Sequence, residues 1–154
     1  MDWTTLAATA LGAFVGVGST LLADRVRWRR DRADRTRQER RQIYVTVLTT
    51  YRLAYEDMRE AALSGDGRER AAAVRRAFRS SGCDEARESA LLCAPQARAD
   101  ALESVYATLR DLQDAFATGD PPLDSPAMQE LRLKHAEAVW AARAAIRADL
   151  EGTD

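Results

Sequence analysis

An uncharged stretch near the N-terminus is the feature that most constrains how this chain can fold. Residues 3–23, WTTLAATALGAFVGVGSTLLA, contain no charged side chain, and Asp24 follows them with a dense series of arginines. A helix of about 20 apolar residues crosses the hydrocarbon core of a bilayer. The stretch therefore predicts a transmembrane anchor over residues 1–23.

Two other interpretations of this stretch stay open, a cleaved signal peptide and a helix buried in a hairpin. A signal peptide begins with a basic segment, has a shorter apolar run and ends at a small-residue cleavage site. This chain begins with Met1-Asp2, its apolar run is longer, and no clear A-x-A site precedes Asp24. We therefore favour an anchor that is not cleaved.

The distribution of charge predicts the orientation of the anchor. Residues 24–41 contain nine arginines and four acids, a net charge of +5, whereas residues 42–154 have a net charge of −5. Positive charge next to a span stays on the cytoplasmic side. The single lysine, the absence of asparagine and the abundance of alanine are typical of a GC-rich bacterial genome. We thus expect a single-pass protein of the bacterial plasma membrane, with its N-terminus outside and its C-terminal domain in the cytoplasm.

Small residues recur every four positions within the predicted span, at Ala8, Gly12, Gly16 and Thr20. Such a ridge, with GxxxG at its centre, lets two transmembrane helices approach closely. The ridge predicts that the chain pairs with a second copy to form a homo-oligomer. The alternative is that the spacing reflects only the Ala- and Gly-rich composition.

The basic segment after the span predicts contact with anionic lipid headgroups, which attract arginines next to a membrane. The candidates are Arg25, Arg27, Arg29, Arg30 and Arg32. The alternatives are that these arginines only fix the topology or that they meet a protein partner. Nucleic-acid binding is disfavoured because four acids are interspersed and Trp28 is the only aromatic residue nearby.

Helical periodicity continues from the basic segment into the rest of the chain. No Gly or Pro occurs in residues 19–64, and although residues 43–50 have β propensity, their apolar side chains follow helical spacing. This stripe consists of Tyr44, Val47, Leu48, Tyr51, Tyr55, Met58 and Ala62. We predict a basic juxtamembrane helical stalk over residues 24–41 and a domain over residues 42–154.

Turn and capping signals divide the remaining chain into helices over residues 68–79, 84–93 and 95–117 and from residue 126 onward. Ser81 and Asp84 have the spacing of a capping box, and Ser125 precedes Pro126 as an N-cap. The predicted inner faces contain Val74, Phe78, Leu102, Val105, Tyr106, Leu109, Leu112, Phe116, Met128, Leu131, His135, Val139, Ala142 and Ile146. The predicted fold class is all-α, an N-terminal transmembrane helix that continues into an antiparallel cytoplasmic four-helix bundle.

Residues with potential chemistry are few. His135 is the only histidine, and the sequence places no nucleophile beside it. Cys83 and Cys93 are more easily explained as small buried residues than as redox or acylation sites. The Glu-x-x-His motif of di-metal bundles does not occur, and the acids fall on outer faces. We expect no catalytic residue, no metal site and no cofactor.

The segments RVRWRRDR at residues 25–32 and QERRQIY at residues 38–44 give the chain a family resemblance. It resembles small actinobacterial single-span membrane proteins that have an Arg-rich collar, and it is faintly similar to the plasmid spread proteins of Streptomyces. The similarity covers the first third of the chain and is compositional, so it assigns no functional residue. It implies an accessory membrane factor in plasmid transfer or phage defence. The residues themselves favour a membrane-tethered helical interaction module without catalytic activity.

Overall fold

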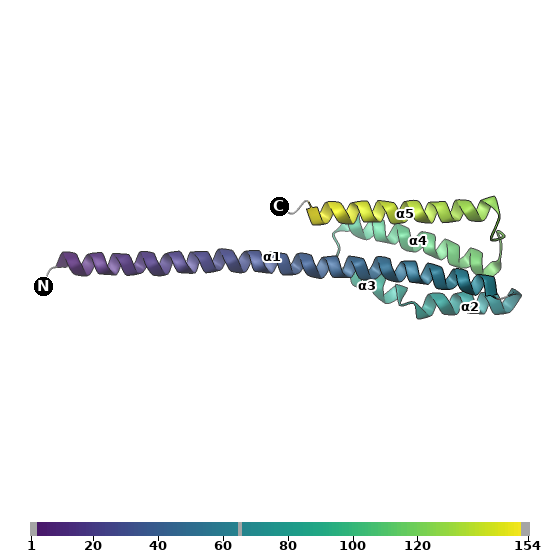
Figure 1. The fold of residues 1–154 in the computed structure, drawn as a ribbon, viewed down its shortest axis with the longest axis horizontal. Helices are drawn as coiled ribbons and strands as arrows, with labels where there is room; N and C mark the ends of the chain where they lie inside the picture. The colour runs from purple at the N-terminus through teal and green to yellow at the C-terminus, as the bar shows by residue number, and fades with distance from the viewer. Residues whose placement is uncertain (1–2, 65, 152–154) are drawn as a thin grey trace. The chain divides into compact units, whose positions relative to one another are not determined.

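The chain is all-helical in the part that the structure describes, as expected from the sequence. This computed structural model describes the backbone of residues 3–64 and 66–151 and the side chains of residues 24, 25, 27–32, 34–64 and 66–148. The helices in these ranges are α1 (Trp3–Ser64), α2 (Gly67–Ser80), α3 (Cys83–Cys93), α4 (Gln96–Thr118) and α5 (Pro126–Glu151) (Figure 1). Residues 43–50, despite their β propensity, are helical.

The chain divides into two units between Glu39 and Arg40, a boundary that falls within α1. Among the residues whose side chains are described, no helix is long and apolar enough to cross a membrane. The predicted anchor, and with it Ala8, Gly12, Gly16 and Thr20, lies outside those residues, so the anchor and the helix-pairing ridge remain predictions.

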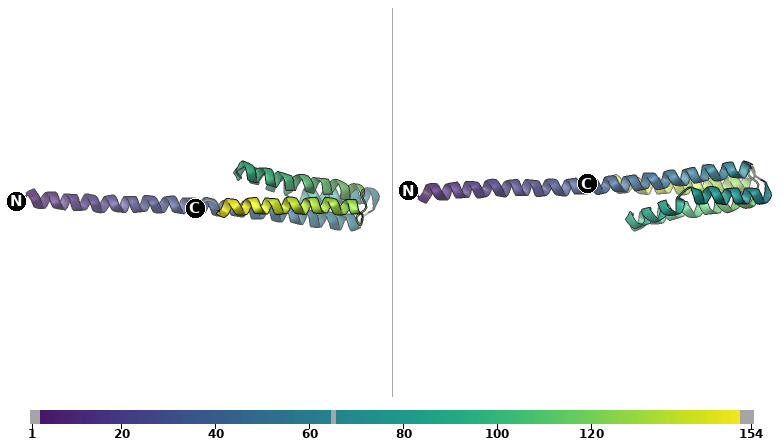
Figure 2. Two further views of the ribbon diagram at one scale, coloured as in Figure 1. Left: turned by 90° about the horizontal axis from the view of Figure 1, so that it is seen from above. Right: turned by 90° about the horizontal axis from the view of Figure 1, so that it is seen from below.

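Within the second unit the helices form an antiparallel bundle with four positions. Residues 40–64 of α1 run in one direction, α2 and α3 run back, α4 runs forward again and α5 returns (Figure 1). The two further views show α2 and α3 following one another along one side of the bundle (Figure 2). The short helix at 83–93 therefore continues the position that α2 occupies, and α4 packs against α2, α3 and α5.

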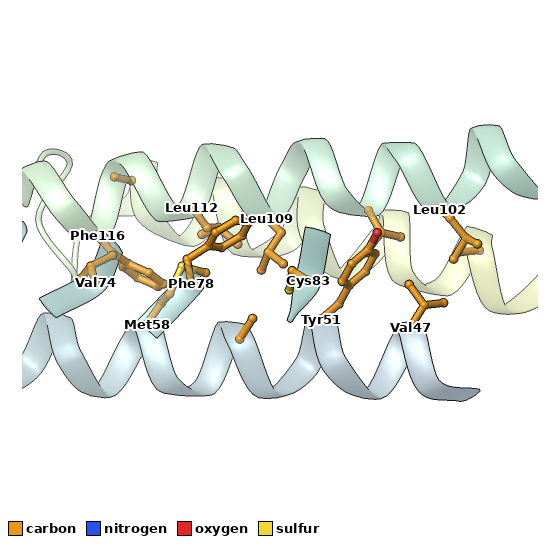
Figure 3. Close-up of a cluster of buried hydrophobic side chains, with 14 of the residues drawn as sticks. Val47, Tyr51, Met58, Val74, Phe78, Cys83, Leu102, Leu109, Leu112 and Phe116 are labelled. Carbon is orange, nitrogen blue, oxygen red and sulfur yellow. The ribbon is translucent and has the colours of Figure 1, made fainter. Parts of the chain in front are cut away.

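The core is built from the stripes that periodicity predicts. Val47, Tyr51 and Met58 of α1 point toward the α4 side chains Leu102, Leu109, Leu112 and Phe116 (Figure 3). Val74 and Phe78 of α2 and Cys83 of α3 close the cluster. Met128, Ala142 and Ile146 of α5 are buried too, with Leu131 and Val139 packed beside them. Burial of this apolar surface is the main term that stabilises such a bundle.

The helix ends agree with the predicted signals at one boundary and differ at another. At α5, the Ser125 Oγ accepts a hydrogen bond from the backbone N–H of Met128 at 3.2 Å, which confirms the predicted N-cap. At α3, the predicted capping box is wrong. Gly82 occupies the N-cap position with φ 75°, and Ser81 Oγ accepts from the N–H of Cys83 instead. A glycine in the left-handed conformation replaces the extended N-cap geometry that the box requires.

Candidate functional site

The five arginines proposed for lipid headgroups, Arg25, Arg27, Arg29, Arg30 and Arg32, are all exposed on α1. The guanidinium carbon of Arg32 lies 5.3 Å from the ring centroid of Trp28, a cation–π contact with an exposed indole. None of the five makes an ion pair with a carboxylate among the described side chains. Their charge is therefore available to an anionic surface.

His135 joins three helices of the bundle. Its Nδ1 lies 2.9 Å from Thr108 Oγ1 of α4, and its ring stacks on Tyr55 of α1 at 5.8 Å between centroids. Burial lowers the pKa of His135, because a charged imidazolium would lose its hydration there. The neutral ring thus serves packing, as expected for a histidine on the inner face.

The two cysteines differ in their surroundings, and both are free thiols. Cys83 is buried, and its Sγ lies 3.9 Å from the backbone oxygen of Thr50. Burial raises the pKa of the Cys83 thiol, which keeps it protonated and weakly nucleophilic. Cys93 is exposed, so the expectation that both are buried is wrong for this residue. Cys93 is the last residue of α3, where the helix ends and its side chain leaves the core.

A cluster of polar side chains connects α3 to α4 through hydrogen bonds and an ion pair. Arg87 binds both carboxylate oxygens of Glu103, with Nη2 donating to Oε2 at 2.9 Å. The Tyr106 hydroxyl donates to Asp84 at 2.6 Å, and the Arg87 guanidinium lies 4.9 Å from the Tyr106 ring centroid. Burial, together with this hydrogen bond, raises the pKa of Tyr106 to about 12. All four side chains are partnered with one another, which indicates a structural role.

The outward face of α5 carries an apolar stripe that the sequence analysis did not identify. Leu133 and Trp140, seven residues apart, are 58% and 67% exposed, and the exposed Ala136 and Ala144 lie on the same side. We call these four residues the α5 outer stripe. The Arg143 guanidinium lies 5.7 Å from the Trp140 ring centroid. The seven-residue spacing of Leu133 and Trp140 is visible in the sequence, but the periodicity of the inner face does not predict it.

Metal-binding potential and similarity to known proteins add no further site. In the described part of the chain, no group of three or more His, Cys, Asp or Glu side chains is placed to hold a metal ion. Comparisons of the chain with family models, with curated proteins and with solved structures find no match in any of the three.

Proposed function

We propose that this protein is a membrane-tethered helical interaction module whose bundle docks a protein partner through the α5 outer stripe. The observation that carries the proposal is the exposure of Trp140 and Leu133 on a helix whose opposite face already fills the core. Tryptophan is enriched at the centres of protein interfaces and among the residues that contribute most to binding. A partner that covers the stripe would remove this apolar surface from water.

The charges beside the stripe favour a different protein over a second copy. Glu137 lies on one side of it, and Arg143 and Arg147 follow toward the C-terminal end, all of them exposed. If two copies associated through this stripe with their α5 helices parallel, the same residues of each copy would face one another. The acidic turn of one copy would then face the acidic turn of the other, and the basic turns of the two copies would also face each other. A partner with an apolar helix face and the complementary charges avoids this repulsion.

The tether in this proposal rests on the sequence. Residues 1–23 cross the plasma membrane, the arginines from Arg25 to Arg32 contact anionic headgroups, and the bundle is held in the cytoplasm. Pairing through Gly12 and Gly16 would bring two bundles together, and nucleic acid is not a partner. Attachment to one surface raises the effective concentration of the stripe for partners in the same membrane.

Site-specific photo-crosslinking in the membranes of living cells tests the proposal. A photoreactive phenylalanine analogue replaces Trp140 in the full chain, and a second variant carries it at Leu92, which is 85% exposed on α3. We expect one defined protein adduct at position 140, its loss with Leu133→Ser, and none at position 92. Adducts at both positions alike, or an adduct that consists only of a second copy or of lipid, would contradict the docking stripe.

The crosslinked protein is then identified by mass spectrometry and purified for a direct binding measurement. Trp140→Ala should weaken its affinity for the full chain at least about 30-fold, as expected for an interface residue that contributes about 2 kcal/mol. Leu92→Ala is the matched control and should leave the affinity within about twofold, which is inside the error of such comparisons. Equal affinities for wild type and Trp140→Ala would show that the adduct reflected mere proximity.

A further inference from the structure

A basic groove between α2 and α4 belongs to neither the membrane collar nor the α5 outer stripe. Its volume is about 710 Å³. Arg75, Arg76 and Arg79 line it from α2, and Arg110, Gln113 and Asp114 line it from α4. Each set has the three- and four-residue spacing of one helix face. Because α2 and α4 run antiparallel side by side (Figure 1), the two faces meet along the groove.

The groove concentrates positive charge that the protein itself does not neutralise. Four arginines and one carboxylate line it, and within the described side chains none of the four arginines makes an ion pair. Helix α2 contains five arginines and one acid, a net charge of +4, in a segment (42–154) whose net charge is −5. Like charges held together destabilise the bundle unless an anion binds among them.

Two of these arginines are held in place. Arg79 Nε donates to the backbone oxygen of Arg75 at 3.3 Å, and the Arg110 guanidinium lies 5.2 Å from the ring centroid of Phe78. Phe78 itself is fully buried in the core. The cationic groups are therefore partly ordered before any ligand arrives, which lowers the entropy lost on binding.

Gln113 adds a buried polar side chain to the lining of the groove. Its side chain is 4% exposed, its Oε1 is buried without a hydrogen-bond partner, and the residue lines the same groove. Buried polar atoms in proteins are nearly always hydrogen-bonded, and an unpaired one is destabilising. An amide contributes both donors and an acceptor, so it can pair with a hydroxyl group of a ligand.

We propose that the groove between α2 and α4 binds a phosphoester that also carries a hydroxyl group. The guanidinium groups of Arg75, Arg76, Arg79 and Arg110 contact the phosphate oxygens, which the planar fork of arginine matches in geometry. On binding, the Gln113 amide turns toward the groove, and its oxygen accepts the one hydrogen bond that the hydroxyl can donate. A soluble metabolite and a lipid headgroup both present this chemistry.

Calorimetric titration of the full chain in zwitterionic detergent with glycerol 3-phosphate tests the proposal. We expect saturable binding to one site per chain. Arg75→Gln with Arg76→Gln should weaken it at least about tenfold, since each hydrogen bond to a charged group contributes about that much or more. The matched control is another adjacent pair, Arg40→Gln with Arg41→Gln on α1, which lies outside the groove and should leave the affinity within about twofold. Equal weakening by both pairs, or no saturable binding, would overturn the site.

Two further measurements guard against misfolding and identify the source of the ligand. Gln113→Met keeps the shape of the side chain and should weaken binding while it raises the melting temperature of the free protein. Unchanged binding would overturn the role of the amide. Phosphatidic acid mixed into the micelles competes with glycerol 3-phosphate if the natural ligand is a headgroup and does not compete if it is soluble; either result is compatible with the site. Tighter competition by a single-stranded oligonucleotide would overturn it in favour of a nucleic-acid groove.

Discussion

At the scale of single residues, Gly119 has a conformation that other residues adopt only with strain. It follows α4 with φ 72°, and its N–H donates to the Ala115 oxygen at 2.9 Å. A Cβ there would overlap the Arg70 guanidinium, whose Nη2 donates to the Thr118 oxygen at 3.1 Å. Gly119→Ala should lower the free energy of unfolding by about 1–2 kcal/mol in urea denaturation.

Gly67 is the matched control for Gly119. It also has a positive φ, 48°, but a Cβ there would have no neighbour within 4 Å. Gly67→Ala therefore reports backbone strain alone, and Gly119→Ala should be the more destabilising of the two. In an Arg70→Ala background this difference should disappear. Equal effects in the wild-type background would mean that Arg70 moves aside without cost.

The half-buried His135 makes the free energy of unfolding depend on pH. Because burial lowers its pKa in the folded protein, the unfolded chain takes up the proton first as the pH falls below the ordinary value of 6.5. The contribution of the neutral His135 to the free energy of unfolding is complete above pH 6.5. It decreases as the pH falls toward the lower pKa of His135 in the folded protein. His135→Gln should reduce the loss of unfolding free energy between about pH 7.5 and pH 5.5. Parallel pH profiles for wild type and variant would contradict this assignment.

At the scale of helices, sequence periodicity was sufficient to place the inner faces. The stripe from Tyr44 to Ala62 and the apolar faces of α4 and α5 are buried or half-buried on the core side as predicted, because a side chain's face follows from helix geometry alone. A capping signal that depends on a single helical turn was confirmed at Ser125. Such a signal failed at Ser81, where the backbone conformation of the neighbouring Gly82 decides which cap forms.

Features formed by residues of two different helices could not be predicted from the sequence. The groove lined by Arg76 and Gln113 exists only because α2 and α4 pack antiparallel, and single-helix periodicity does not specify that pairing. The contact between His135 and Thr108 depends on the same kind of information. The exposure of Cys93 follows from where α3 ends relative to the core.

The predicted span leads to a test of helix pairing. Bulk at Gly16 should separate two backbones that meet along the ridge of Ala8, Gly12, Gly16 and Thr20 and should weaken self-association. Gly18 lies about 160° around the helix from Gly12, at 100° per residue, so Gly18→Ile should have much less effect than Gly16→Ile. An in-membrane reporter of association on the full chain compares the two variants. Equal loss of self-association in both variants, or no loss in either, would contradict the predicted pairing ridge.

At the scale of the whole molecule, the chain combines a helical bundle with a predicted membrane anchor. The bundle of residues 40–154 rests on a described core, and its outward stripe and basic groove are features of that core's packing. The anchor rests on a charge-free segment followed by nine arginines. Under the proposed function, docking through Trp140 would take place at the cytoplasmic surface of the membrane.

Topology is the most direct test of this account. The full chain is expressed in bacteria with alkaline phosphatase, or with green fluorescent protein, fused after Asp154, and the membranes are washed with alkaline carbonate. We expect the chain to remain in the washed membranes, with fluorescent fusions and inactive phosphatase fusions, because positive charge keeps the C-terminal side inside. Release of the chain by the wash, or an active phosphatase fusion, would contradict the tether or its orientation.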